Sequence, residues 1–236
     1  MRQDLEIMKL AALFSGGKDS TFAIYLAKKQ GHEINCLLTI FPKSEESHLL
    51  HHPNMAWTSL QAESMNIPQI TEESLSDETQ SELDLIEKIL IKAKKDFQIE
   101  GMVHGGIKSK FQKNNFEKLC DKLNLKSISP LWDTDPKQYM NDLVDENFDF
   151  IITSVSSAGL DDSWLGKKIG KADLVQLEKL SDKFEFNLNF EGGEAETFVV
   201  NCPLFYRPID IIKGEKIWDG YRGRFEIVDA RLDYDA

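Results

Sequence analysis

Residues 10–27 read LAALFSGGKDSTFAIYLA, an apolar run followed by a glycine turn and a second, mostly apolar segment. The first run predicts a buried strand, and the last segment predicts a helix that begins after the turn. A strand that leads through glycines into a helix presents free backbone N–H groups and the positive helix end to an anion. The stretch therefore predicts a phosphate site on an α/β fold.

Two common phosphate loops do not fit this stretch. A Walker A loop needs a glycine and a Ser or Thr at the positions that Ala12 and Asp19 occupy here. A dinucleotide fingerprint has three spaced glycines, whereas this turn has only Gly16 and Gly17. The pattern Ser-Gly-Gly-Lys-Asp-Ser instead resembles the loop of the PP-loop family, the ATP pyrophosphatases. Members of that family cleave ATP between the α and β phosphates and release AMP and pyrophosphate.

The uncharged residues of this loop suit a polyphosphate. Gly16 and Gly17 allow left-handed backbone angles and a close approach to phosphate oxygens. Ser15 and Ser20 add hydroxyl donors, and Ser20 can cap the helix that we expect to begin there. The alternative is a structural turn, in which glycine serves geometry and serine serves capping.

Lys18 and Asp19 carry the charges of the loop. The Lys18 ammonium can neutralise the departing pyrophosphate. Asp19 can cap the helix or help to hold a phosphate-bound Mg²⁺. We therefore expect both residues to be catalytic, ATP and Mg²⁺ to bind here, and Asp19 to be the metal ligand.

The composition narrows the class of protein. The chain has 236 residues and a formal net charge of −12, which argues against direct binding to nucleic acid. Its three cysteines, Cys36, Cys120 and Cys202, form no CxxC pair and predict reduced, mostly buried thiols. No run approaches eighteen apolar residues, and the first residues lack the apolar stretch of a signal peptide, so we expect a cytoplasmic protein without membrane contact.

Short apolar runs alternate with longer amphipathic segments, which is typical of a parallel sheet flanked by helices. We expect strands near residues 9–14, 34–41, 67–70 and 101–104, and helices near 20–30, 55–65, 79–97 and 110–123. His104 ends the last of these strands and Gly105 follows it, at the position where ligands of parallel sheets bind, although a structural histidine fits the position equally well.

The pattern changes after Leu131. A helix is expected to start at Asp135 or Pro136 and to run to about residue 147, before a buried strand at 148–155. Residues 184–190 alternate strictly between apolar and polar and predict a half-buried strand. We therefore expect a nucleotide domain at 1–130 and a second domain at 131–236 that packs tightly with it.

A second motif, Glu191-Gly192-Gly193-Glu194-Ala195-Glu196-Thr197, follows this alternating stretch. Its glycines permit a tight bend that projects three carboxylates within seven residues. Clustered carboxylates repel one another, so a cation, a metal or a basic substrate would be a natural partner. The alternative is a solvent-exposed loop whose glutamate carboxylates are hydrated and bind no ligand.

Together the two motifs resemble those of the diphthine–ammonia ligase family. Further stretches agree along most of the chain: His52-Pro53-Asn54, Gln61-Ala62-Glu63, Gly105-Gly106-Ile107, Leu131-Trp132 and Gly159-Leu160-Asp161-Asp162-Ser163-Trp164-Leu165-Gly166. The resemblance implies a Rossmann-like fold of the adenine nucleotide alpha hydrolase (HUP) type. In that fold a helix-flanked parallel sheet is joined to a smaller C-terminal α+β substrate domain.

The resemblance also implies a reaction. The carboxylate of diphthine, a modified histidine of elongation factor 2 that bears a trimethylammonium group, attacks the ATP α-phosphate to give an acyl adenylate and pyrophosphate. Ammonia then displaces AMP and leaves diphthamide. The implied partners are diphthine-bearing elongation factor 2 and ammonium, and a homodimer is compatible with them.

The family resemblance also implies which cations the acidic motif would bind. Glu191, Glu194 and Glu196, on the bend made by Gly192 and Gly193, could neutralise the quaternary ammonium or bind the incoming ammonium ion. We expect Glu194 to be catalytic as well. Trp164 could offer an aromatic face to the same cation, although a core role is the plainer reading for a tryptophan.

Two other classes of function stay open. One is a PP-loop ligase that acts on a different carboxylate or on a nucleobase, since the fold and the ATP loop would survive such a change. The other is an ATP-binding sensor without chemistry. AMP formed only in the presence of the modified factor would distinguish an enzyme from a sensor.

Overall fold

The computed structural model describes residues 6–43, 54–76 and 78–234, which group into two compact units. Unit 1 draws on Met1–Ser15, Asp19–His52 and Ile67–Trp132, and unit 2 on Gly16–Lys18, Pro53–Asn66 and Asp133–Ala236. The sequence places residues 16–18 and 54–66 in the first half, whereas in the structure they group with unit 2. His52 and Pro53, which contribute to the family resemblance, lie outside the described residues.

Unit 1 contains a parallel sheet, as its alternating pattern predicts. Its described strands pair in the order β3-β2-β1-β4-β5, and every neighbouring pair is parallel. The strands are β1 (Lys9–Leu13), β2 (Glu33–Phe41), β3 (Gln69–Glu73), β4 (Gly101–Val103) and β5 (Lys126–Ile128). β1 lies at the centre, where Ala12 pairs with Leu37 on one side and Val103 on the other.

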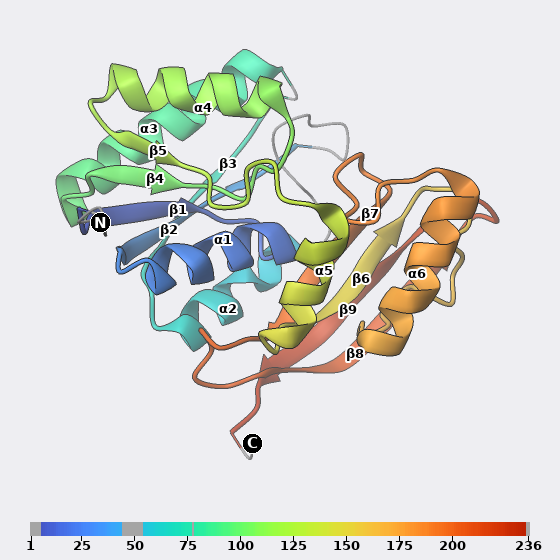
Figure 1. The fold of residues 1–236 in the computed structure, drawn as a ribbon. Coiled ribbons are helices and arrows are strands. Elements are labelled where there is room, and N and C mark those ends of the chain that lie inside the picture. The colour runs from blue at the N-terminus through green and yellow to red at the C-terminus, as the bar shows by residue number, and fades with distance from the viewer. Residues whose placement is uncertain (1–5, 44–53, 77, 235–236) are drawn as a thin grey trace. The chain divides into compact units, whose positions relative to one another are not determined.

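Helices cover both faces of this sheet. Figure 1 shows α3 (Thr79–Phe97) and α4 (Lys110–Lys122) over one face and α1 (Lys18–Lys29) over the other. α3 buries Ile86, Ile89, Leu90 and Ala93, which recur at helical spacing and pack onto β2 and β3. The helix expected near 79–97 is therefore confirmed, and its buried apolar face packs on the sheet that carries the phosphate loop.

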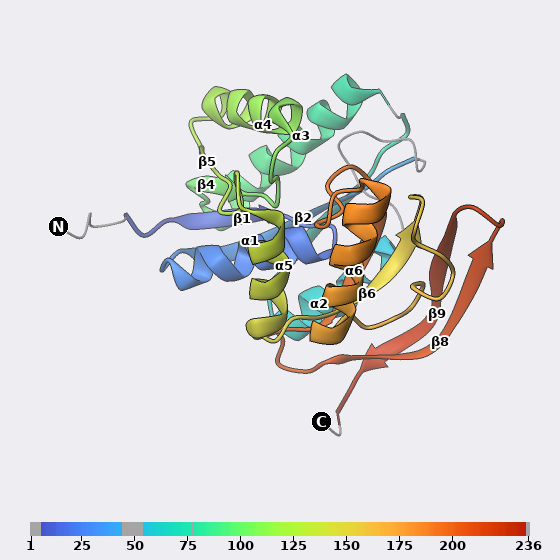
Figure 2. The same cartoon turned by 45° about the vertical axis from the view of Figure 1, so that its right-hand side comes forward.

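Unit 2 contains an antiparallel sheet in the order β7-β6-β9-β8. Its strands are β6 (Asp149–Val155), β7 (Ala195–Asn201), β8 (Ile209–Trp218) and β9 (Gly223–Leu232). Figure 2 shows β8 and β9 as a long hairpin. The predicted buried strand near 148–155 is confirmed as β6, whose phenylalanine and isoleucines are buried.

A short helical segment is bound to this sheet through its first residues. It consists of the 3-10 turn η1 (Met55–Trp57) and helix α2 (Thr58–Met65). The Asn54 amide donates to Phe225 O (2.9 Å) and accepts from Ile227 N (2.8 Å), as a neighbouring strand would. The Trp57 indole N–H donates to Ile227 O (2.8 Å). These bonds place residues 54–66 in unit 2.

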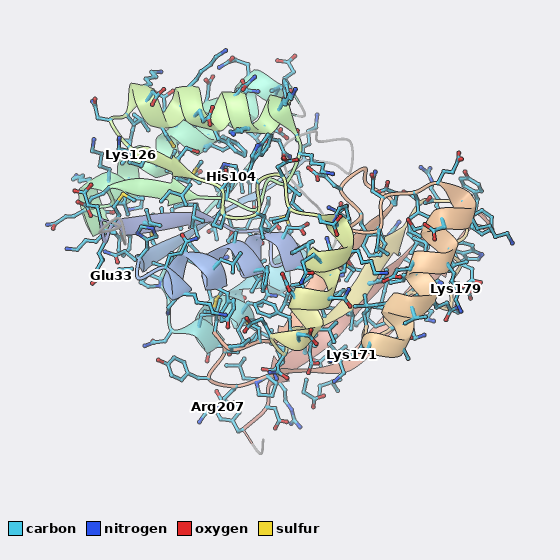
Figure 3. The ribbon with its side chains drawn as sticks, viewed as in Figure 1. Glu33, His104, Lys126, Lys171, Lys179 and Arg207 are labelled. Carbon is cyan, nitrogen blue, oxygen red and sulfur yellow. The ribbon has the colours of Figure 1, made fainter. Side chains whose placement is uncertain are left out.

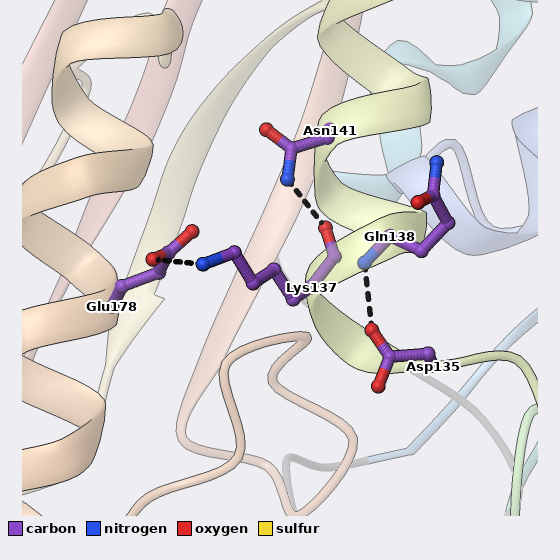
Figure 4. A network of polar contacts seen from close by, with 5 residues as sticks. All are labelled: Asp135, Lys137, Gln138, Asn141 and Glu178. Atoms are coloured by element: carbon purple, nitrogen blue, oxygen red, sulfur yellow. Dashed lines mark hydrogen bonds and ion pairs between the residues drawn. The ribbon is translucent and has the colours of Figure 1, made fainter.

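Helix α5 (Pro136–Asp145) begins where the sequence predicts. Gln138 N donates to the Asp135 carboxylate at 2.9 Å, so Asp135 is the N-cap and Pro136 stands in the first turn (Figure 4). Lys137 Nζ reaches Glu178 of α6 (Lys171–Phe184) at 2.8 Å. The cap sets the start of the helix and thereby the direction of its buried residue Tyr139.

The predicted strand at 184–190 is wrong. Phe184 is the last residue of α6, and Glu185 ends the helix in the left-handed region with φ 59°. The apolar side chains of Phe186, Leu188 and Phe190 are buried, but these residues belong to no strand, and Phe190 N donates to Asn187 O (2.8 Å). Burial does not follow the predicted alternation throughout either, because Phe184 is exposed and the polar Asn189 is buried.

The three cysteines are buried and free of disulfide bonds, as predicted. Burial raises the pKa of the Cys36, Cys120 and Cys202 thiols to about 12, so the reactive thiolate is disfavoured. Among the described helices, none combines the length and the apolar character that crossing a membrane requires.

Candidate functional site

The carboxyl ends of β1 and β4 bring two predicted site segments together in unit 1. The two strands are parallel neighbours, so the chain leaves both at the same edge of the sheet. Ser15 follows β1, and His104 with Gly105 follows β4. Strand order runs in opposite directions on the two sides of β1, which is the switch point where open α/β sheets bind ligands.

Ser15 and Ser20 close the turn between β1 and α1. Ser15 N donates to Ser20 Oγ at 3.3 Å, and the two hydroxyl oxygens lie 3.2 Å apart. The helix begins at Lys18, two residues before the expected start, so Ser20 lies inside the first turn. The prediction that Ser20 starts and caps the helix is therefore wrong, because its hydroxyl binds Ser15 instead.

Gly105 fits against the first turn of α1. A Cβ at this position would lie 2.6 Å from the carbonyl carbon of Asp19 and 2.7 Å from Ser20 N. Both neighbours are backbone atoms of a helix, so they cannot move aside as a flexible side chain would. Gly105 therefore sets the close approach of β4 to the helix end where we expect the phosphates.

His104 is buried beside this contact, beneath α4 (Figure 3). Its Nδ1 accepts from Gly106 N at 3.2 Å, which leaves the ring proton of the neutral imidazole on Nε2. Its ring meets that of Phe116 edge to face at 5.0 Å. Burial, with a smaller contribution from the Lys113 charge, lowers the pKa of His104 to about 4. Nε2 has no hydrogen-bond partner within the described residues.

Gly16 is held by strand β7 and helix α2. Its carbonyl oxygen accepts from Val199 N (3.0 Å) and from the Gln61 amide (2.9 Å), which also donates to Val199 O (2.7 Å). Gly16 adopts φ 80°, and a Cβ there would overlap the Gln61 amide oxygen. The glycine is therefore required both for its left-handed backbone and for the close packing of Gln61.

Lys18 is held at its backbone and at its side chain. Lys18 N donates to Thr197 Oγ1 at 3.1 Å. Its ammonium lies 5.7 Å from the ring centroid of Tyr139 and 5.6 Å from that of Phe190, within the range of cation–π attraction. The residue is only 2% exposed. The loop lysine and the C-terminal motif thus meet within unit 2.

The Glu194 side chain folds back onto its own loop. Its Oε1 accepts from Asn187 N (2.9 Å) and from the Asn187 amide (2.6 Å), and its Oε2 accepts from Gly192 N (2.8 Å). A Cβ on Gly192 would lie 2.6 Å from Glu194 Oε1. Gly193 adopts φ 81°, and its carbonyl accepts from the Ser156 hydroxyl at 2.7 Å. Glu194 and the two glycines therefore define the shape of the bend.

The other two glutamates are placed differently. Glu191 is half-buried, and Glu196 is the second residue of β7, opposite Ser154 of β6. Successive strand residues face opposite sides, so Glu196 and Thr197 do not share a face. Within the described ranges, no group of three or more His, Cys, Asp and Glu side chains is arranged to hold a metal ion.

Trp164 is a buried residue of unit 2, only 2% exposed. Lys167 Nζ lies 4.7 Å from the centroid of its ring and 2.6 Å from the Asp173 carboxylate. A cation of the protein itself therefore already contacts this aromatic face. This geometry fits a structural role for Trp164 in the core, which the sequence left open, better than it fits an exposed ring that binds a ligand.

Four residues of this site had no role assigned from the sequence: Gln61, Tyr139, Phe190 and Thr197. Phe190 directly precedes the acidic motif, Thr197 is its last residue, and Gln61 belongs to a stretch that the family shares. Their partners lie far away in the sequence; the Lys18–Thr197 bond spans 179 positions. Spacing carries no sign of such contacts.

A hollow of about 430 Å³ lies on the opposite edge of the unit 1 sheet, at the amino ends of the strands. Met8, Glu100 and Lys126 are among the residues that line it. Ligands of open parallel sheets bind at the carboxyl edge, so we place no site in this hollow.

The chain matches the family model described as diphthamide synthase N-terminal domain over residues 8–127, and the one described as diphthamide synthase C-terminal domain over residues 135–232. It is 33% identical over 228 residues to the diphthine–ammonia ligase of Rattus norvegicus, which covers 89% of this chain and 85% of that protein. The protein of the same name from Homo sapiens is 29% identical over 232 residues, with the same coverage of 89% and 85%.

Solved structures match this chain as well. One of them is described as a predicted subunit of a tRNA methyltransferase from Methanocaldococcus jannaschii, and the match covers 98% of this chain and 100% of that one, at 15% identity and a TM-score of 0.41. That score is too low to bear on fold or function.

Proposed function

Because this chain belongs to the diphthamide synthase family of enzymes, we propose that it is an ATP-dependent ligase that amidates diphthine on elongation factor 2. The two family models together reach from residue 8 to residue 232, so both motifs fall within them. Diphthine is the acceptor because the relatives carry the name diphthine–ammonia ligase. The product is diphthamide, with AMP and pyrophosphate released from ATP.

The observation that carries the proposal is the attachment of the acidic motif to the phosphate loop. Strand β7 begins inside that motif, and its residues bind the Gly16 carbonyl and the Lys18 amide directly. A ligase must bring an acceptor and the ATP α-phosphate together, and a shared backbone contact supports such an arrangement.

We propose that activation occurs at the Ser15–Ser20 loop. The acceptor carboxylate attacks the α-phosphorus, the bond to the bridging oxygen breaks, and the electron pair leaves with pyrophosphate. The first N–H groups of α1 and the Lys18 ammonium would stabilise the charge that develops there. Ammonia then attacks the acyl carbon and AMP leaves, so that an amide forms and one proton is released.

Mg²⁺ would be held by Asp19 together with the phosphate oxygens of ATP. Asp19 is the acidic residue in the first turn of α1, and no larger cluster of metal-binding side chains occurs in the described residues. Sites built from one or two carboxylates plus substrate phosphates are typical for this ion. When bound, the ion would offset the negative charge of the phosphates.

Within the acidic motif we propose different roles for the glutamates. Glu191 and Glu196 would attract the trimethylammonium group or the ammonium ion. Glu194, whose two oxygens already accept three hydrogen bonds, would hold the bend in shape. His104 would offer its Nε2–H to the nucleotide, because the neutral ring carries that proton and the described residues provide no acceptor for it.

The test is to incubate the purified protein with Mg-ATP, ammonium and diphthine-bearing elongation factor 2. We expect AMP release together with the small mass decrease of a carboxylate that becomes an amide. Both should require ammonium and the modified factor, and both should be lost in Asp19→Ala. AMP formed only with another acid would indicate a ligase for a different carboxylate, and ATP binding without AMP would indicate a sensor.

The setting of the reaction belongs to the same proposal. Elongation factor 2 is a cytoplasmic protein, so the enzyme would act in the cytoplasm. The net charge of −12 favours recognition of a protein and a cation over direct contact with nucleic acid. A homodimer stays a prediction, which the mass of the particle in solution would test.

A further inference from the structure

The residues on both sides of the segment that carries the three glutamates, Glu191 to Glu196, contact Lys18 of the phosphate loop. Phe190 directly precedes Glu191, and its ring centroid lies 5.6 Å from the lysine ammonium. Thr197 directly follows Glu196, and its hydroxyl accepts the lysine backbone N–H at 3.1 Å. The acidic loop between them is thus anchored at both ends on one residue, and that residue belongs to the other motif.

The backbone contact reaches an N–H group at the start of helix α1. Lys18 is the first residue of α1, and the first N–H groups of a helix have no acceptor within the helix. Thr197 Oγ1 supplies that acceptor, while the neighbouring Gly16 carbonyl is bound by Val199 N and Gln61. The loop conformation around Lys18 is therefore set by β7 and α2.

The side-chain contact places the ammonium near two aromatic rings. Tyr139 and Phe190 are 1% and 4% exposed, so they are withdrawn from water as Lys18 is, and cation–π attraction strengthens under these conditions. Phe190 adopts φ 63°, which is uncommon for a residue other than glycine. Its N–H donates to Asn187 O and its carbonyl accepts from Gly193 N, so the turn of the acidic loop holds it there.

We infer that Phe190, Tyr139 and Thr197 are positioning residues for Lys18, through which the order of the acidic loop controls the affinity for ATP. The inference rests on the proposed function, since it takes the Ser15–Ser20 loop as the ATP site. The two rings restrict the side chain of Lys18, and the Thr197 hydroxyl restricts its backbone. A lysine that is already held in this way loses less conformational entropy when a polyphosphate binds. Because coupling between binding sites is reciprocal, ATP should in turn strengthen binding of the cationic acceptor.

The backbone contact is tested with Thr197→Val and Thr197→Ser. We expect the valine variant to raise the Kd for ATP on the order of tenfold, because the Lys18 N–H loses its acceptor. The serine variant keeps the hydroxyl and should bind ATP as the wild type does. Thr71→Val makes the same change at an exposed position of β3 and should leave the Kd unchanged. Calorimetric titration with ATP measures all four proteins.

The side-chain contact is tested with a double-mutant cycle. Phe190→Leu should raise the Kd for ATP in the wild type, but should have little further effect in Lys18→Met, because the ring acts through the ammonium. Phe190→Leu should also lower kcat, since the Lys18 ammonium is proposed to stabilise the charge that develops on pyrophosphate. Loss of the fold in either variant would be visible in the unfolding transition of the same sample.

The outcomes separate the two proposals. If the wild type binds ATP while Thr197→Val and Phe190→Leu bind it equally well, the inference falls and the proposed function stands. The inference also falls if valine and serine at residue 197 weaken binding equally, or if the effects of Phe190→Leu and Lys18→Met simply add. If the wild type binds no ATP, the proposed function itself falls.

Discussion

His104 shows how burial determines the chemistry of a single residue. Its Nδ1 accepts a backbone hydrogen bond, so the neutral ring presents a proton at Nε2. A charged imidazole would have to lose its hydration in this apolar setting beside Phe116, which lowers the pKa of His104 to about 4. At neutral pH the ring is therefore a hydrogen-bond donor without charge.

This buried histidine should make stability depend on pH. Its pKa is about 4 in the folded protein against an ordinary 6.5, so the unfolded chain binds an extra proton between these values. Above pH 6.5 the neutral, buried His104 does not lower the free energy of unfolding. As the pH falls toward 4, the free energy of unfolding decreases by about 3 kcal/mol in total, because the unfolded chain takes up the proton first.

Denaturant unfolding of the wild type and His104→Gln from pH 8 to pH 4 measures this effect. The difference in unfolding free energy between the two proteins should shrink as the pH falls through the window. A difference that stays constant with pH would show that His104 titrates normally.

Glu194 shows how a charged residue can serve the backbone. Removal of its carboxylate in Glu194→Ala leaves two backbone N–H groups and the Asn187 amide without their acceptor. We expect amide exchange at Gly192 to accelerate on the order of tenfold or more. Turnover should fall as the bend loses its shape.

Hydrogen exchange followed by mass spectrometry measures the loosening, with Glu215→Ala on the exposed β8 as a matched control. Glu194→Gln keeps one acceptor oxygen and should fall between the wild type and the alanine variant. If the glutamine variant stopped turnover while exchange stayed slow, the carboxylate would act on substrate directly, as the sequence suggested.

At the scale of elements, the junction of β4 and α1 depends on the absence of one side chain. In Gly105→Ala the new Cβ would press on the backbone of Asp19 and Ser20, and the first turn of α1 would have to shift. We expect the free energy of unfolding to fall by about 1–3 kcal/mol and the KM for ATP to rise.

Gly170→Ala is the matched control for this change, because its new Cβ would find its nearest atom at an ordinary 3.8 Å. Denaturant unfolding and ATP titration of both variants make the comparison. Equal effects of the two substitutions would show that the close approach of Gly105 is not what stabilises the junction.

Helix starts could be predicted well where the cap lies next to the helix, as at Asp135. The start of α1 could not be predicted in this way, because the Ser20 hydroxyl accepts from Ser15 and does not cap the helix, which begins at Lys18. The alternating stretch 184–190 misled for a similar reason. The alternation correctly marks Phe186, Leu188 and Phe190 as buried, but a strand also needs a neighbouring strand with which to pair.

At the scale of the whole molecule, Gln61 joins three segments that are distant in sequence. Its amide donates to Gly16 and Val199 from helix α2, and the residue is fully buried. In Gln61→Met the Val199 carbonyl would lose this donor at nearly constant volume. We expect the free energy of unfolding to fall by about 1–3 kcal/mol, with weaker ATP binding.

Urea unfolding and ATP titration measure this pair of effects. Gln80→Met removes a glutamine amide at the exposed start of α3, where it bonds only Asp84 among the contacts described, and serves as the control. A Gln61→Met protein as stable as the control, with unchanged ATP affinity, would show that the amide is dispensable to the loop.

The sequence by itself determined the order of strand, glycine loop and helix, the parallel sheet, the helix stripes and the family, because these depend on neighbouring residues and short spacings. Only the tertiary structure decided that Thr197 and Phe190 contact Lys18, that Gln61 binds Gly16, and that Glu194 supports its own loop. Such contacts depend on how segments that are distant in the sequence pack together. That packing depends on the backbone angles of many intervening residues, and no local sequence pattern encodes it.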